Sequence, residues 1–293
     1  MEIAIKGLSK TYPNGVKALD NVNLNIKQGM FGLLGANGAG KSTLMRTIAA
    51  LQEPDTGSIH LDNLNILEDK MAVRRVLGYL PQEFGVYSKV KTYELLNHLA
   101  ILKGIVHKGE RREMVDALLQ KTNLWQYRKR YVSSFSGGMK QRFGIAQALL
   151  GEPLLIIVDE PTAGLDPGER NRFYNILSEI GESMIVILST HIVEDVKELC
   201  TQMAILHQGK LVLSDKPQNA IEKLKGKVWS KTIEKRDLPE YQKNYNVLSS
   251  KLIAGEPQIH VLNDGSPEAG FQPVDVDLED VFFSQIVGDT SVH

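Results

Sequence analysis

The chain has 293 residues, of which 42% are hydrophobic and 24% charged, and its 34 basic and 35 acidic residues give a formal net charge of −1. This usage excludes wholesale disorder, and the balanced charge excludes a global field that would hold nucleic acid or anionic lipid. No apolar run approaches the roughly 18 residues that cross a bilayer, the first residues lack a secretory signal, and a single cysteine excludes a disulfide within the chain. We therefore expect a soluble cytosolic protein of one large domain or two small ones.

Short apolar runs alternate with helix-like segments over the first two-thirds of the chain. Unbroken runs rich in β-branched residues are typical of strands that helices cover on both faces, so the sequence predicts a wound α/β sheet. The predicted strands of this sheet are Met30 to Leu34, Leu154 to Val158, Met184 to Leu188 and Met203 to Leu206.

The stretch from about residue 88 to residue 150 differs from this pattern. Its leucines and methionines recur at helical spacing, for example Leu95, Leu99 and Leu102, and no strand-like run separates them. We expect an all-helical insertion into the sheet domain.

The composition changes again at Pro217. Residues 217–251 carry eight Lys or Arg and four Asp or Glu, whereas residues 252–293 carry no Lys or Arg and eight Asp or Glu. This split predicts a main domain over residues 1–216 and a small C-terminal α+β accessory domain over residues 217–293. Within the latter, residues 227–233 and 257–263 are predicted strands and residues 276–287 a closing amphipathic helix.

The stretch GANGAGKST follows the first predicted strand and fits the phosphate-loop pattern G-x-x-x-x-G-K-[ST]. Its glycines let the backbone turn so that successive N–H groups converge on phosphate oxygens, and the following helix adds its positive N-terminal end. Lys41 would reach the β- and γ-phosphates, and the Ser42 hydroxyl would bind Mg²⁺. The alternative, a glycine-rich turn that binds nothing, is disfavoured by the complete pattern. The predicted binding residues of this loop are Gly35, Asn37, Gly38, Ala39, Gly40, Lys41, Ser42 and Thr43.

Acidic and imidazole side chains end two further predicted strands. Asp159 and Glu160 follow the strand LLIIV, and His191 follows the strand MIVIL and the dipeptide Ser-Thr. Ligands of open α/β sheets bind at the carboxyl ends of the strands, so Asp159 can order a Mg²⁺ shell and Glu160 can accept a proton from an attacking water. Taken alone, each of these residues is as well explained as a surface group, and the phosphate loop upstream favours the functional interpretation, with His191 contacting a γ-phosphate.

Ser136, Gly137 and Gly138 precede another helix-like segment. A serine cap followed by two glycines exposes several backbone N–H groups, which makes a second anion site. A plain helix cap is the alternative that these three residues alone would support.

These motifs together resemble the ATP-binding cassette (ABC) family of nucleotide-binding subunits. The stretch FSGGMKQR looks like the family's signature motif, PTAGLDP contains a D-loop that ends at Asp166, and Gln82 matches the Q-loop glutamine. Tyr12 matches the aromatic residue that stacks on adenine. The resemblance covers about residues 2–216. It departs from the usual LSGGQ in having Phe135 for leucine and Met139 for glutamine, and Met139 cannot donate an amide hydrogen bond to a partner-bound nucleotide.

The resemblance implies a P-loop NTPase sheet with an antiparallel β edge, ATP and Mg²⁺ as cofactors, and ATP hydrolysis as the activity. It implies a second cassette that encloses ATP head to tail, a separate integral membrane permease, no nucleic-acid partner, and a position on the inner face of the cell membrane. The implied catalytic residues are Glu160, His191, Lys41 and Gln82, the metal ligands Ser42, Gln82 and Asp159, and the ATP contacts outside the phosphate loop Tyr12, Ser136, Gly138 and Asp166.

Within this family, 293 residues cannot hold two cassettes and no sustained heptads mark a chromosome-maintenance protein, which leaves a transporter subunit. Residues 83–105 and the ending DLEDVFFSQI look like the drug- and antibiotic-exporting (ABC-2 type) branch, although that ending is equally typical of an amphipathic helix that packs on the cassette. An importer subunit and a non-transport ATPase switch stay open as alternatives. A GTPase is disfavoured because no Asn-Lys-x-Asp motif occurs.

Overall fold

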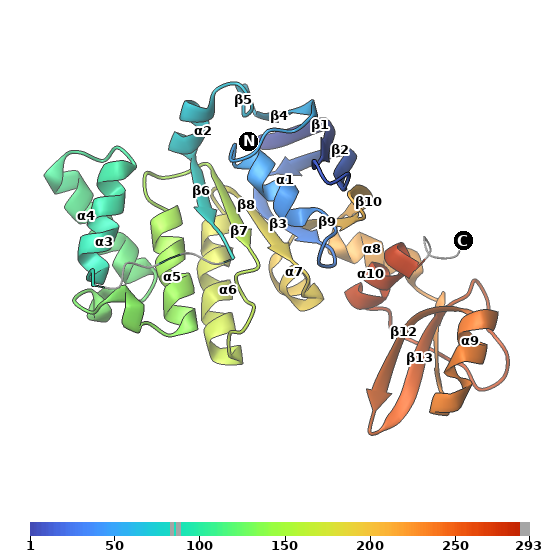
Figure 1. The fold of residues 1–293 in the computed structure, drawn as a ribbon. Coiled ribbons are helices and arrows are strands. Elements are labelled where there is room, and N and C mark those ends of the chain that lie inside the picture. The colour runs from blue at the N-terminus through green and yellow to red at the C-terminus, as the bar shows by residue number, and fades with distance from the viewer. Residues whose placement is uncertain (83–84, 86–88, 288–293) are drawn as a thin grey trace.

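The structure is a computed structural model that describes residues 1–82, 85 and 89–287. Figure 1 shows a central sheet, a helical lobe at one side and a small β-rich lobe at the other. Residues 83, 84 and 86–88, which belong to the segment that resembles the exporting branch, lie outside the described residues, as do residues 288–293.

The central sheet has six strands in the order β10-β9-β3-β8-β7-β6. All neighbours are parallel except β10, which pairs antiparallel with β9. The α/β fold class is confirmed, and each of the four predicted strands lies in this sheet. The strands are β3 (Gly29–Leu34), β6 (Leu77–Leu80), β7 (Leu155–Asp159), β8 (Ile185–Thr190), β9 (Gln202–His207) and β10 (Lys210–Asp215).

Both faces of this sheet are buried, which explains why its strands are hydrophobic without interruption. Because neighbouring residues of a strand point to opposite faces, Leu155 and Ile157 enter one core while Ile156 and Val158 enter the other. The first core is closed by α1 (Lys41–Ile48) and by an antiparallel sheet in the order β2-β1-β4-β5. That second sheet is the expected antiparallel edge; its strands and the nearby helix are β1 (Glu2–Thr11), β2 (Lys17–Lys27), β4 (Thr56–Leu61), β5 (Leu64–Asn65) and α2 (Lys70–Val76).

The opposite face is covered by helices α5, α6 and α7 and continues into the helical lobe. Between the end of β6 and the start of β7 the elements of the described chain are helices and 3-10 turns, as the sequence predicts, and an isolated β-bridge joins Lys91 to Tyr131. The bounds are α3 (Thr92–Leu102), α4 (Lys108–Lys121), α5 (Gly137–Ala148), α6 (Pro167–Gly181) and α7 (Val193–Leu199), with 3-10 turns at Trp125–Tyr127 and Val132–Ser134.

The C-terminal segment divides its packing between two cores. Its antiparallel sheet, in the order β12-β13-β11-β14, has a small core of its own around Ile259, Val261 and Phe271. The helices at its two ends, α8 and α10, instead contribute to the main core of the cassette (Figure 1). The elements are α8 (Pro217–Leu224), β11 (Val228–Thr232), a 3-10 turn (Lys235–Asp237), α9 (Leu238–Asn244), β12 (Asn246–Ile253), β13 (Glu256–Leu262), β14 (Gln272–Pro273) and α10 (Leu278–Val287).

Helix α10 packs against α7, α8, β9 and β12. Leu278 is fully buried and Val281 is 2% exposed, both inside the main core. The amphipathic helix predicted from the sequence therefore lies on the cassette. The composition changes at Pro217, but the packing does not divide there, because α8 and α10 both contribute to the main core. Across the described residues, every helix is too short or too polar to cross a bilayer.

Replacing Leu278 with alanine should lower the free energy of unfolding by about 2–5 kcal/mol, because it leaves a cavity in the main core. Leu252→Ala is the matched control, since Leu252 is 72% exposed on β12 and its truncation should cost less than about 0.5 kcal/mol. Urea unfolding followed by circular dichroism measures both variants. Equal unfolding midpoints would show that α10 does not stabilise the cassette.

Candidate nucleotide site

The loop between β3 and α1 has a backbone that only glycine adopts easily. Gly38 and Gly40 have φ angles of 82° and 107°, and a Cβ at Gly40 would lie 2.3 Å from the carbonyl oxygen of Ala18. Ala39 is buried, and its carbonyl accepts a hydrogen bond from Gly209, so the loop is anchored to the start of β10. Asn37 and Gly38 are exposed at its tip.

This loop wraps around the Lys41 ammonium. The Nζ atom of Lys41 donates to the carbonyl oxygens of Gly35, at 2.8 Å, and Ala36, at 3.2 Å. Burial lowers the pKa of Lys41, and the neighbouring charge of Glu160 partly offsets this. A cation is thus held at the N-terminus of α1, where the free N–H groups of the first helical turn also favour an anion.

The carboxylate of Glu160 contacts the other three predicted catalytic residues, Lys41, Gln82 and His191. Its Oε1 lies 3.5 Å from Lys41 Nζ, and its Oε2 lies 3.2 Å from His191 Nδ1 and accepts a hydrogen bond of 3.2 Å from Gln82 Nε2. The Glu160 side chain is 11% exposed, so water can still reach it. The structure brings these four side chains together from the start of α1 and from the three loops that follow β6, β7 and β8, although only Lys41 belongs to the phosphate-loop motif.

The backbone of Glu160 is strained. Its φ angle is 47°, in the left-handed region that a non-glycine residue rarely adopts, and its N–H donates to the carbonyl oxygen of Ser189 at 2.8 Å. The side chain that leaves this turn meets His191, the residue that follows β8. Such strain is characteristic of functional sites.

Asp159 is 6% exposed at the end of β7, and its pKa is raised chiefly by burial, which the Ser189 and Ser42 hydroxyls partly offset. Its Oδ1 has no hydrogen-bond partner among the residues that the structure describes. An unpartnered buried carboxylate oxygen beside a hydroxyl fits a hard divalent cation, which takes oxygen ligands and would compensate the charge. Gln82 donates a hydrogen bond from its Nε2 to Glu160, and its role as a metal ligand stays a prediction.

Tyr12 lies beside the phosphate loop. Its hydroxyl donates to Gln52 Oε1 at 3.0 Å and lies 3.1 Å from Thr43 Oγ1. The backbone N–H of Tyr12 is bonded to the carbonyl oxygen of Val16, within the turn between β1 and β2. The ring is therefore held at a defined place near the start of α1, and its role toward adenine stays a prediction.

Ser136, Gly138 and Asp166 are not part of the cluster around Glu160. Ser136 caps α5, with its Oγ accepting the Met139 N–H, and Asp166 caps α6. Figure 1 places α5 on the helical side, apart from the loop between β3 and α1. Gly138 is buried against Glu169, whose carboxylate would lie 2.4 Å from an added Cβ. Met139, the departure from the usual signature, packs its side chain against the main core.

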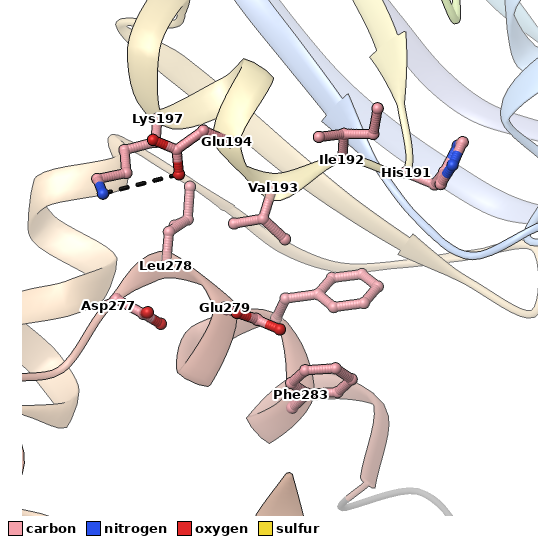
Figure 2. A pocket seen from close by; sticks show the side chains of 10 residues that line it. His191, Ile192, Val193, Glu194, Lys197, Asp277, Leu278, Glu279 and Phe283 are labelled. Carbon is pink, nitrogen blue, oxygen red and sulfur yellow. Dashed lines mark ion pairs between the residues drawn. The ribbon is translucent and has the colours of Figure 1, made fainter. Parts of the chain in front are cut away.

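His191 also borders a second hollow. A pocket of about 310 Å³ lies between the segment from His191 to Lys197 and helix α10. Figure 2 shows Val193 and Leu278 facing each other across it, with the Glu194–Lys197 ion pair at one end and His191 at the other. The C-terminal helix α10 thus lies across this pocket from the loop that carries His191.

Sequence reasoning did not find Asp195, the most completely buried charged residue near the site. It is 0% exposed and accepts hydrogen bonds from Thr162, Tyr174 and Thr190. Acidic residues are common in the first turn of helices, so the sequence offered no signal that separates Asp195 from the exposed Glu194.

Comparisons with known proteins identify the class. The family model described as ABC transporter matches residues 19–163. The chain is 35% identical over 210 residues to YxlF, an uncharacterized ABC transporter ATP-binding protein of Bacillus subtilis (strain 168), with 71% of this chain and 69% of that protein covered. The chain belongs to the ABC transporter family and carries its ATP-binding ATPase cassette.

Two further likenesses extend this assignment. The chain is 31% identical over 304 residues to YbhF of Escherichia coli (strain K12), a probable multidrug ABC transporter ATP-binding protein; the match covers 98% of this chain but 52% of YbhF, so this chain spans about half the length of that relative. The dimeric structure of MJ0796, a bacterial ABC transporter cassette, superimposes with a TM-score of 0.66 at 28% identity and covers 73% of this chain and 98% of MJ0796.

Gly40→Ala tests whether the shape of the loop matters for nucleotide. The new Cβ would meet the Ala18 carbonyl oxygen, so we expect ATP binding to weaken by at least roughly tenfold, or about 1.4 kcal/mol. Gly226→Ala is the matched control, because Gly226 also has a positive φ, 75°, but has nothing within 4 Å of the added Cβ. Titration with a fluorescent ATP analogue compares the two, and equal affinities would remove the loop from the site.

Proposed function

We propose that this chain is the ATP-hydrolysing subunit of an ABC transporter, that it works as a dimer, and that it powers export through a separate membrane permease. The observation that carries the proposal is the convergence of Lys41, Gln82 and His191 on the carboxylate of Glu160, directly beside the glycine loop. A base, an imidazole and a cation at the edge of a parallel sheet are the parts that phosphoryl transfer to water needs.

In this proposal ATP lies along the loop from Gly35 to Thr43, with its phosphates on the backbone N–H groups of the first turn of α1. Lys41 moves from the carbonyl oxygens of Gly35 and Ala36 to the β- and γ-phosphates, because phosphate carries far more negative charge than a carbonyl dipole. Ser42, Asp159 and Gln82 would hold Mg²⁺, which would neutralise charge that develops on the phosphates.

Glu160 acts as the general base. When Lys41 turns to the phosphates, Glu160 loses that ion pair and its carboxylate becomes available to accept a proton from a water aimed at the γ-phosphate. His191, 3.2 Å from Glu160 in the structure, contacts the γ-phosphate, and Gln82 orients the water or the cation. Tyr12 stacks on adenine.

The second ATP-enclosing surface comes from another copy of the chain. Ser136 and Gly138 lie at the N-terminus of the twelve-residue helix α5, whose backbone N–H groups can bind a phosphate, yet they lie away from the Glu160 cluster of their own chain. Head-to-tail pairing brings Ser136, Gly138 and the D-loop residue Asp166 of one chain to the phosphate loop of the other. The dimeric state named for the MJ0796 cassette supports this arrangement.

Export is the direction that the relatives favour. The E. coli relative is described as a probable multidrug transporter protein, and the C-terminal helix DLEDVFFSQI resembles the same branch. The permease would hold the chain at the inner face of the membrane, and nucleic acid has no role.

Tyr12→Ala should weaken ATP binding by about 1–3 kcal/mol, the usual contribution of one aromatic ring stacked on a base. Tyr12→Phe is the matched control, since it keeps the ring and loses only the hydroxyl bonded to Gln52 and Thr43. Fluorescence titration should then find near wild-type affinity for Tyr12→Phe. Equal losses for both variants would show that the hydroxyl, and not the ring, matters.

Glu160→Gln should abolish most hydrolysis while it leaves binding intact, because an amide keeps the size of the side chain but takes no proton. ATP then stays unhydrolysed, and the lost negative charge relieves repulsion with the phosphates. Size-exclusion chromatography with MgATP should therefore find a dimer that the wild type forms only briefly.

Adding Ser136→Arg should abolish that dimer, because a bulky side chain blocks the N-terminus of α5, while ATP binding by the monomer survives. A Glu160→Gln protein that hydrolyses ATP at the wild-type rate would remove Glu160 from the role of base. An ATP-bound dimer that tolerates Ser136→Arg would overturn the head-to-tail arrangement.

A further inference from the structure

Asp195 lies in the first turn of α7, is 0% exposed, and is held by hydroxyl groups from three elements. Its Oδ2 accepts hydrogen bonds from Thr162 Oγ1 at 2.6 Å and Thr190 Oγ1 at 2.8 Å. Its Oδ1 accepts a hydrogen bond from the Tyr174 hydroxyl. Burying a carboxylate is costly unless it is hydrogen-bonded, so three short bonds at one residue indicate a place where geometry is specified strongly.

Two of these three partners lie next to the catalytic side chains in the sequence. Thr190 directly precedes His191, and its Oγ1, which donates to Asp195, also accepts the N–H of Ile192 at 2.9 Å, so the Thr190 hydroxyl links both neighbours of His191 to the Asp195 carboxylate. Thr162 follows Glu160 by two residues, and Tyr174 lies on α6, which the D-loop enters at Asp166. One carboxylate therefore joins the backbone that carries His191 to the backbone that carries Glu160.

The hydrogen bonds also set which group can occupy this place. All three hydroxyls donate to Asp195, and burial together with the Asp195 carboxylate raises the pKa of Tyr174, so that phenol stays protonated as a donor. An asparagine at position 195 would turn its NH2 group toward at least one of the hydroxyls, and that hydroxyl would lose its acceptor. A carboxylate accepts all three bonds at once.

We propose that Asp195 is a positioning residue that holds His191 against Glu160. The inference rests on the proposed function, since it assigns Asp195 a part in the same hydrolytic site. Asp195 touches neither ATP nor the attacking water, and acts through the two threonine hydroxyls on the loops that do.

The test compares Asp195→Asn and Thr190→Val with the matched control Glu194→Gln. Glu194 directly precedes Asp195 on α7, and its side chain is 53% exposed. We expect kcat for ATP hydrolysis to fall roughly tenfold to a hundredfold in the first two variants, the scale of a small misplacement of a reacting group. The Kd for ATP should change by less than about threefold, and Glu194→Gln should match the wild type.

A double variant separates positioning from general loss of structure. In a His191→Ala background, Thr190→Val should lower kcat by less than about twofold, because the side chain that it positions is gone. Thr190→Val nearly conserves volume, and it leaves Asp195 in place. It therefore serves if Asp195→Asn fails to fold, as circular dichroism would reveal.

A spectroscopic readout needs no hydrolysis. The ring resonance of His191, assigned by its loss in His191→Ala, should move in Thr190→Val toward its position in Glu160→Ala, because both changes part the ring from the carboxylate. An unmoved His191 resonance, or an equal fall of kcat in the His191→Ala background, would overturn the positioning role. A wild-type protein that does not hydrolyse ATP would overturn the proposed function instead, and the resonance would still decide the role of Asp195.

Discussion

The register of three parallel strands determines where the chemistry lies. Leu34 of β3 pairs with Thr190 of β8, and Asp159 of β7 pairs with Ser189 of the same strand. The residues that follow these pairs therefore leave the sheet side by side: the glycine loop, His191 and Glu160. A slip by one residue in either pairing would exchange the side chains that enter the two cores on the opposite faces of the sheet. The hydrophobic pattern that builds the core thus also positions the site.

This arrangement removes several charged groups from water, which is energetically unfavourable. Lys41 and Asp159 are almost fully buried. Burial lowers the pKa of Lys41 and raises the pKa of Asp159, so it favours the neutral form of each. Their surroundings offset this only in part, since Lys41 is bonded to carbonyl oxygens and one oxygen of Asp159 has no partner in the described part of the chain. In the proposed function, ligands of opposite charge would compensate these groups, phosphate for the lysine and a divalent cation for the aspartate.

The C-terminal segment is joined to the cassette by more than its connecting chain. Helix α10 packs its apolar side against α7 (Figure 2). Helix α7 begins two residues after His191 and contains Asp195. On its other side, Asp280 of α10 accepts a hydrogen bond from His260 of β13 at 2.7 Å, and Lys251 of β12 is paired with Glu279. The small sheet and the loop of His191 are therefore connected through a single helix.

The sequence by itself determined the parts that are local. The glycine loop, the apolar strands, the carboxylates after LLIIV and the helical stretch before the signature are contiguous patterns, and their chemistry requires no knowledge of distant residues. Sequence could not specify the distances around Glu160, because they follow from strand register and from a strained turn. Nor could it single out Asp195, whose partners Thr162 and Tyr174 lie 33 and 21 residues away in the chain, or assign α10 to the main core. Those features depend on which buried surfaces pack together, and only the tertiary structure decided them.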